Sequence, residues 1–91
     1  MKYELLRTTQ FKKDYKLAVK RGCDIKKLMT VVTLLANGEQ LPPEYRDHSL
    51  TGNYSGYREC HIQPDWLLVY KVVEQQLILT LYRTGTHIDL F

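Results

Sequence analysis

The chain has 91 residues, of which 44% are hydrophobic and 25% are charged, and its formal net charge is +3. We therefore expect residues 1–91 to form a single domain with one modest core. No apolar run approaches the roughly 18 residues of a membrane span, and the N-terminus lacks the apolar core of a signal peptide, which predicts a cytoplasmic protein with no membrane partner. Cys23 and Cys60 lack disulfide-framework and metal-ligand spacing, so both are expected to be reduced thiols.

The chain begins with a predicted strand and a capped helix. Residues 2–8 have the length and composition of a strand, although Glu and Leu make the pattern ambiguous. Thr8 or Thr9 can cap the helix that follows, and Gly22 ends it. The apolar residues that recur at helical spacing are Phe11, Tyr15, Ala18 and Val19.

A second helix is predicted between Asp24, which can cap its start, and Gly38, which ends it. Its expected buried residues are Ile25, Leu28, Val31, Val32 and Leu35. Because only a short turn separates the two helices, we expect a helical hairpin.

A stripe of lysines follows the first helix on a face of its own. Lys12, Lys16 and Lys20 are spaced by four residues, so they project from one side. A local positive field of this kind favours a polyanionic partner, but a solvated helix face would have the same pattern.

The rest of the chain predicts a loop and three strands. Residues 39–56 are polar and rich in Pro and Gly, and loops of this length inside a compact domain are usually functional. The strand-like segments are 57–62, 66–73 and 77–84, and a turn with an extended or helical tail follows. Short joins imply antiparallel hairpins. The predicted fold class is α+β, with an N-terminal strand, a helical hairpin and an antiparallel meander that the helices cover on one face.

The meander should bring polar residues from separate strands to one edge of the sheet. One strand ends near His61, the next begins at Asp65 and Trp66, and the last returns to that edge near Arg83. His87 follows shortly after Arg83. We therefore expect these five side chains to lie close together.

His48, in the predicted loop, can also reach this edge, although nothing local requires it. Three imidazoles with a carboxylate suit zinc or iron, but no paired ligand spacing supports a metal site. A triad around Cys60 is disfavoured, because strand alternation sends Cys60 and His61 to opposite faces.

The third chemistry that suits these residues is phosphodiester cleavage in RNA. The substrate's 2′-hydroxyl is then the nucleophile, and the protein supplies a base, an acid and positive charge. Imidazoles, with an ordinary pKa of about 6.5, can be both acid and base at neutral pH. An arginine matches phosphate oxygens, and aromatic rings stack on unpaired bases. This chemistry needs no metal and no cofactor.

The segments "YRDHSLTGNYSGYRECHIQPDWLLVYKV" and "RTGTHIDLF" resemble the YafQ branch of the RelE/ParE toxin superfamily, and the resemblance extends over nearly the whole chain. It implies the RelE-like microbial RNase fold. It also implies a toxin of a type II toxin–antitoxin pair that enters the ribosomal A site and cleaves messenger RNA there, which halts translation. The implied partners are a cognate DinJ- or RelB-like antitoxin, the 70S ribosome with its mRNA, and operator DNA through the antitoxin complex only.

The resemblance implies catalytic roles for His48 of "DHSL", His61 and Asp65 of "HIQPDW", and His87 of "RTGTH". We expect one of His48 and His87 to be the acid and the other the base, with His61 and Asp65 positioning the phosphate or an imidazole. The residues expected to contact RNA are Trp66, Arg83, Phe91, Lys12, Lys16 and Lys20.

Two alternatives remain open at the level of sequence. Leu90 and Phe91 either close the core together, or Leu90 anchors the tail while Phe91 supports the site or stacks on a base. The function could also be that of a non-catalytic inhibitor that occupies the ribosome or, as in ParE-type relatives, acts on DNA gyrase. A gyrase inhibitor would not need the set of imidazoles.

Overall fold

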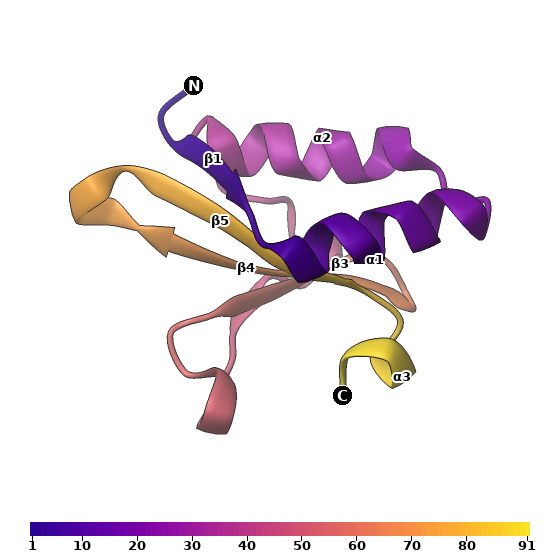
Figure 1. Cartoon of the computed structure of the whole chain (residues 1–91). Coiled ribbons are helices and arrows are strands. Elements are labelled where there is room, and N and C mark those ends of the chain that lie inside the picture. The colour runs from indigo at the N-terminus through magenta and orange to yellow at the C-terminus, as the bar shows by residue number, and fades with distance from the viewer.

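A twisted five-stranded sheet carries two helices on one face and a short C-terminal helix on the other (Figure 1). The computed structural model describes residues 1–91. The helices and strands are β1 (Glu4–Arg7), α1 (Thr9–Lys20), α2 (Ile25–Ala36), β2 (His48–Ser49), β3 (Arg58–Gln63), β4 (Trp66–Val73), β5 (Ile78–Gly85) and α3 (His87–Leu90). None of the helices is both long and apolar enough to cross a bilayer.

The strand order in the sheet is β1-β5-β4-β3-β2. The meander β3-β4-β5 is antiparallel, as predicted, whereas β1 pairs in parallel with β5. The segment 39–56, predicted as a loop, also contributes a strand, because β2 pairs antiparallel with β3. His48 lies opposite Glu59 in this pairing, so the sheet itself fixes the position of His48.

Helix α1 starts where the sequence predicts, but its buried face is different from the predicted one. Thr8 is the N-cap, and its Oγ1 accepts a hydrogen bond from the Phe11 backbone N–H at 2.9 Å. Phe11 and Ala18 are buried, whereas Val19 is 51% exposed and Asp14 is only 8% exposed. The prediction for Val19 is therefore wrong. Asp14 replaces it on the inner face because it finds polar partners on β5, which are described below.

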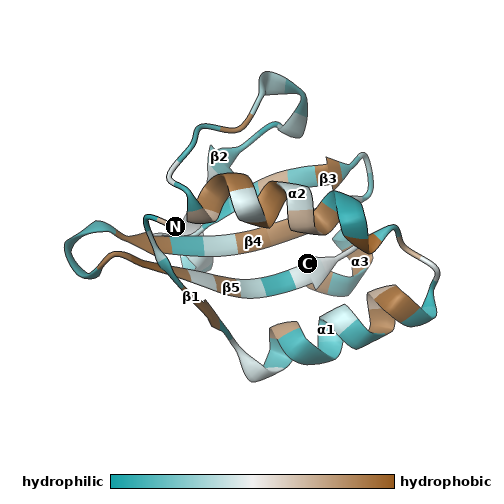
Figure 2. Ribbon diagram, turned by 90° about the horizontal axis from the view of Figure 1, so that it is seen from above, coloured by the Kyte–Doolittle hydropathy of each residue, from teal (hydrophilic) through white to brown (hydrophobic).

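Helix α2 supplies most of the helical contribution to the main core. Asp24 is its N-cap and accepts a hydrogen bond from the Lys26 backbone N–H at 3.1 Å. Its buried residues are Leu28, Val31, Val32, Leu35 and Ala36. Figure 2 shows α2 lying over β3 and β4, with α1 beside β5. This helical layer buries the sheet face that carries Leu68 and Tyr70.

Strand β4 is buried on both of its faces, which explains its nearly continuous apolar sequence (Figure 2). Leu68 and Tyr70 face the helices, whereas Leu67 and Val69 join a smaller cluster on the opposite face with Leu90 of α3. The tail therefore closes a second core layer. This layer fixes the C-terminal end of the chain against the centre of the sheet.

Candidate active site

The three histidines of the chain form a row on the sheet face opposite α1 and α2. The ring centroids of His48 and His61 are 6.4 Å apart, and those of His61 and His87 are 5.8 Å apart. They come from β2, β3 and α3, so three elements must fold before the row exists. His61 and His87 are both predicted at this edge of the sheet. His48 joins them, although nothing in its local sequence requires it to.

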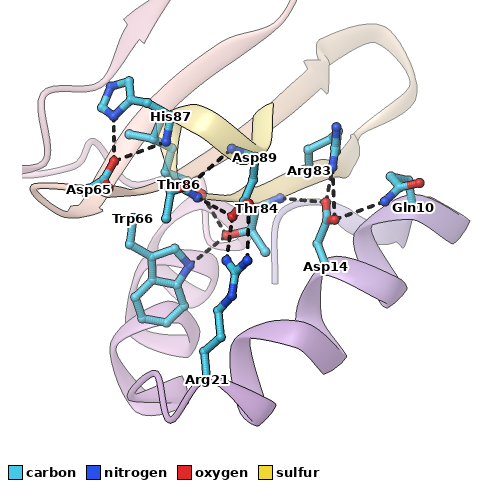
Figure 3. A network of polar contacts seen from close by, with 11 residues as sticks. Gln10, Asp14, Arg21, Asp65, Trp66, Arg83, Thr84, Thr86, His87 and Asp89 are labelled. Carbon is cyan, nitrogen blue, oxygen red and sulfur yellow. Dashed lines mark hydrogen bonds and ion pairs between the residues drawn. The ribbon is translucent and has the colours of Figure 1, made fainter. Parts of the chain in front are cut away.

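His87 is held by Asp65, which lies in the β3–β4 turn (Figure 3). Asp65 Oδ1 is 2.8 Å from His87 Nδ1 and also accepts a hydrogen bond from the His87 backbone N–H at 3.1 Å. The pKa of the Asp65 carboxyl is lowered, mainly because the hydrogen bond from the His87 side chain stabilises its charged form. With Nδ1 engaged, Nε2 is the ring atom that His87 can offer to a substrate.

His48 is held in a comparable way by the backbone. Its Nδ1 lies 2.7 Å from the carbonyl oxygen of Arg46. Because a carbonyl can only accept, Nδ1 is the donor, and a neutral His48 therefore has its lone pair on Nε2. His48 and His87 thus each have one ring nitrogen fixed and the other free.

The loop that carries His48 is tied to the sheet through its neighbour Asp47. Asp47 accepts hydrogen bonds from the Tyr70 hydroxyl and from Arg58 Nη2, the latter at 3.0 Å. Arg58 Nη1 also donates to Ser49 Oγ at 2.7 Å. Burial raises the pKa of Tyr70, so its hydroxyl remains a donor to Asp47. These contacts hold the backbone on both sides of His48.

Glu59 lies beside the row of histidines, although the sequence patterns described above do not predict it there. Its Oε1 lies 3.6 Å from His48 Nε2 and 3.7 Å from His61 Nε2, and its side chain is only 7% exposed. The sequence does carry a signal for it, since residues i and i+2 of a strand share a face and His61 follows Glu59 at that spacing. A carboxylate between two imidazoles can stabilise positive charge on either ring.

Trp66 is not available for stacking on RNA, contrary to the expectation from the sequence that it contacts RNA. Its ring is 5% exposed and belongs to the main core, on the face opposite the histidines. Its Nε1 donates to Thr84 Oγ1 at 2.9 Å. As the first residue of β4, Trp66 alternates with Leu67 and so points toward the helices. Its contribution is to packing beneath the site.

Arg83 also has a structural partner in place of a free side chain. Its Nε and Nη2 donate to the two carboxylate oxygens of Asp14 at 3.0 and 3.1 Å (Figure 3). Asp14 also accepts a hydrogen bond from the Thr84 backbone N–H at 3.2 Å. The predicted sheet-edge cluster therefore does not form as one group, because Arg83 is directed toward α1.

Phe91 lies at the surface, whereas its neighbour Leu90 is buried. Phe91 is 57% exposed, and its ring and that of Tyr54 are in a T-shaped arrangement with the centroids 5.3 Å apart. Leu90 alone closes the second core layer, so the packing alternative for Phe91 does not fit its exposure.

The exposed Lys12, Lys16 and Lys20 follow one side of α1, and none of them makes an ion pair.

A cavity of about 460 Å³ adjoins the row at His61. Its cationic lining residues are Lys27 and Arg46, and Glu44 also lines it.

Cys60, next to His61 in sequence, is fully buried on the other face, and burial raises the pKa of its thiol to about 12. No group of three or more His, Cys, Asp or Glu side chains is arranged to hold a metal ion.

Comparison with known proteins gives consistent matches. The family model "Bacterial toxin of type II toxin-antitoxin system, YafQ" matches residues 3–91. The mRNA interferase toxin YafQ of Escherichia coli strain K12 is 48% identical over 83 residues, which cover 90% of this chain and 88% of that protein. The crystal structure of YafQ from E. coli BL21(DE3) superposes with a TM-score of 0.92 at 43% identity, covering 98% of both chains. A crystal structure of the E. coli DinJ–YafQ complex superposes with a TM-score of 0.91 at 44% identity, also covering 98% of both chains.

Proposed function

Because this chain belongs to the YafQ family of toxins from type II toxin–antitoxin systems, we propose that it is an mRNA interferase. In this proposal it is a ribosome-dependent endoribonuclease that cleaves messenger RNA in the A site and so inhibits translation. The observation that carries the proposal is the row of three imidazoles with Glu59 and Asp65 beside it. The chemistry is acid–base cleavage through the 2′-hydroxyl, with no metal ion.

His48 is the general base in this mechanism. Its neutral form has the lone pair on Nε2, which can take the proton from the attacking 2′-hydroxyl. The ring then becomes an imidazolium, and Glu59 Oε1 lies 3.6 Å from the nitrogen that has gained the proton. Because Glu59 is largely shielded from solvent, its charge is screened less than that of a surface carboxylate.

His87 is the general acid. Because Asp65 Oδ1 engages Nδ1, Nε2 is the nitrogen from which a protonated His87 can donate. That proton can pass to the 5′-oxygen as it leaves the phosphorus. The contacts of Nδ1 in His48 and in His87 support this choice of base and acid, which the sequence leaves open.

His61 lies between the base and the acid, where the reacting phosphate has to sit. Its imidazole can donate a hydrogen bond to a phosphate oxygen as negative charge develops. The adjoining cavity, with Lys27 and Arg46 in its lining, provides room and positive charge for the RNA chain next to this phosphate. Phe91, exposed at the end of the row that carries His87, can stack on a base.

The partners follow from the same family membership. The E. coli relative is found in a complex with DinJ, and we propose a DinJ- or RelB-like antitoxin for this chain. Binding to operator DNA would then occur only through the antitoxin complex. The lysines Lys12, Lys16 and Lys20 would contact ribosomal RNA phosphates.

The proposal is tested with programmed ribosomes and an mRNA that carries a single 2′-deoxynucleotide on the 5′ side of the cleaved bond. We expect the unmodified mRNA to be cut and to yield a 2′,3′-cyclic phosphate and a 5′-hydroxyl, whereas the 2′-deoxy mRNA stays intact at that position. Cleavage of the 2′-deoxy mRNA at the same bond would overturn the 2′-hydroxyl mechanism.

The state of the ribosome-bound mRNA also distinguishes a nuclease from a non-catalytic inhibitor. An inhibitor that only occupies the ribosome, or that acts on DNA gyrase, would arrest growth while the ribosome-bound mRNA stays uncut. Growth arrest that is retained by His87→Ala without new mRNA ends would support that alternative and overturn the proposed nuclease.

A further inference from the structure

We propose that Arg21, at the C-terminal end of α1, is a positioning residue for His87 and acts through Asp89 of α3. This inference rests on the proposed nuclease function, because His87 is the acid of that mechanism. Arg21 and Asp89 are separated by 68 residues in sequence, and neither belongs to the row of histidines. The ion pair between them joins the first helix of the chain to the turn that carries the catalytic imidazole (Figure 3).

Helix α3 is too short to hold its own orientation. It has four residues, and isolated helices of this length are not stable in water. Its N-terminus is closed by a capping box, in which Thr86 Oγ1 accepts from the Asp89 backbone N–H and Asp89 Oδ2 accepts from the Thr86 backbone N–H. This box shapes the turn but does not connect it to the rest of the molecule. External contacts must therefore fix the direction in which His87 points.

The contact to α1 is a charge-assisted pair of hydrogen bonds. Arg21 Nη1 donates to Asp89 Oδ2 at 2.6 Å, and Nη2 approaches Oδ1 at 3.3 Å. The same carboxylate is thus shared between the capping box and Arg21. These contacts lower the pKa of the Asp89 carboxyl to about 2, with Arg21 as the largest cause. Two-point contacts of this kind fix an angle as well as a distance.

The backbone beside Asp89 is packed closely enough to transmit this restraint. A Cβ placed on Gly85 would lie 2.9 Å from Asp89 Oδ2 and 3.0 Å from Asp89 Cβ. Gly85 ends β5 and pairs with Leu67 of β4, so Asp89 packs closely against the end of β5. Arg21 on one side and Gly85 on the other therefore confine the carboxylate, and with it the α3 backbone.

The remaining contacts of α3 fix other degrees of freedom. Leu90 is buried in the second core layer, which sets the depth of the helix. Asp65 holds the His87 ring and backbone N–H, but it is itself an exposed turn residue. Arg21, by contrast, extends from the end of a three-turn helix that is anchored by Phe11 and Ala18. It is the contact through which the rigid helical layer sets the rotation of α3.

The test compares Arg21→Ala with Lys26→Ala, which removes the same charge from an exposed lysine that makes no ion pair. We expect Arg21→Ala to lower kcat for ribosomal mRNA cleavage by about 5- to 50-fold with KM unchanged, because small misplacements of catalytic groups are costly. The melting temperature should change by no more than about 4 °C, since exposed ion pairs contribute little to stability. Lys26→Ala should match the wild type in all three quantities.

Two further variants make the test specific. Arg21→Lys keeps one charged donor and should recover part of the lost kcat. Asp89→Asn keeps the acceptor for the Thr86 N–H but removes the charge, so Arg21→Ala should have a smaller effect in the Asp89→Asn background than in the wild type. Amide and imidazole NMR signals of residues 86–91 should shift in Arg21→Ala and not in Lys26→Ala, whether or not RNA is present.

Three results would overturn the inference: a wild-type kcat in Arg21→Ala, a raised KM with unchanged kcat, or unchanged NMR signals for residues 86–91. A raised KM alone would mean that Arg21 contacts the RNA directly. A failure of the proposed nuclease is distinguishable, because the wild type would then cleave no mRNA while the NMR comparison would still report whether Arg21 orients α3.

Discussion

At the scale of single residues, His48 and His87 share one arrangement. In each, Nδ1 faces an oxygen acceptor, a backbone carbonyl for His48 and the Asp65 carboxylate for His87. The sequence could predict His61, Asp65 and His87 as neighbours, because hairpin topology forces the strand ends together. It could not predict that Glu59 lies between two rings, since this depends on the pairing of β2 with β3.

We predict that alanine in place of His48, His61 or His87 lowers mRNA cleavage by roughly 10²- to 10⁴-fold, the usual contribution of a general acid or base. The fold should be retained, because His48 and His87 are exposed and His61 is only partly buried. Single-turnover cleavage on programmed ribosomes, with circular dichroism as the folding control, measures both quantities. Three folded variants with full activity would show that the row is not the active site.

Phe91→Ala should separate stacking from packing. Because the ring is 57% exposed, its loss should leave the melting temperature nearly unchanged. If the ring stacks on a base, activity should fall by about 5- to 150-fold, since such stacking contributes about 1–3 kcal/mol. Leu90→Ala is the contrasting variant, because Leu90 is buried and its truncation should lower stability. Unchanged cleavage by Phe91→Ala would leave the ring without a role in the reaction.

At the scale of elements, the spacing of apolar residues is sufficient to predict both long helices and the three strands of the meander. It was not sufficient for β2, because a strand of two residues carries no pattern and exists only through its pairing with β3. The prediction that Val19 lies on the inner face of α1 is wrong for a related reason. Asp14 is buried because Arg83 and Thr84, about seventy residues away in sequence, satisfy its carboxylate, and no local pattern reports such a distant partner.

Removing a single oxygen atom, the hydroxyl of Tyr70, should weaken the attachment of the His48 loop to the sheet. Tyr70→Phe removes the hydroxyl that donates to Asp47 and leaves this carboxylate with fewer partners. We expect a loss of about 1–3 kcal/mol in the free energy of unfolding, measured by urea denaturation. Cleavage should also fall, because the backbone on one side of His48 is released. Tyr82→Phe is the matched control, because Tyr82 is a half-buried residue whose hydroxyl makes no hydrogen bond.

Charge reversal on α1 tests the lysine stripe. Lys12→Glu, Lys16→Glu and Lys20→Glu together should weaken ribosome binding and make its dependence on salt shallower, because fewer counterions are released. Once the complex is formed, the rate of the chemical step should be nearly unchanged, since the stripe lies on α1, away from the histidines. Equilibrium binding at several salt concentrations is the measurement. Wild-type affinity and salt slope in the triple variant would make the stripe a solvated helix face.

At the scale of the whole molecule, the C-terminal turn is attached to the body by carboxylates, so acid should release it. The folded pKa of Asp89 is about 2, below its ordinary value of 3.8, and the hydrogen bonds from His87 also lower that of Asp65. A depressed pKa adds stability above the ordinary value, and this stability is lost as pH falls from about 4 toward 2. Melting temperatures across this range should fall more steeply for the wild type than for Asp89→Asn. Parallel curves would contradict the linkage.

The parallel pairing of β1 with β5 has a consequence for the order of events during protein synthesis. The first strand of the chain has its only partner in the last strand, so it must wait for β5 to leave the ribosome before it can enter the sheet. His87 follows β5, and its supports on α1 and in the β3–β4 turn become useful only after that pairing. A nascent chain therefore has no complete row of histidines. During this interval an antitoxin already present can meet the new chain before its row of histidines is complete.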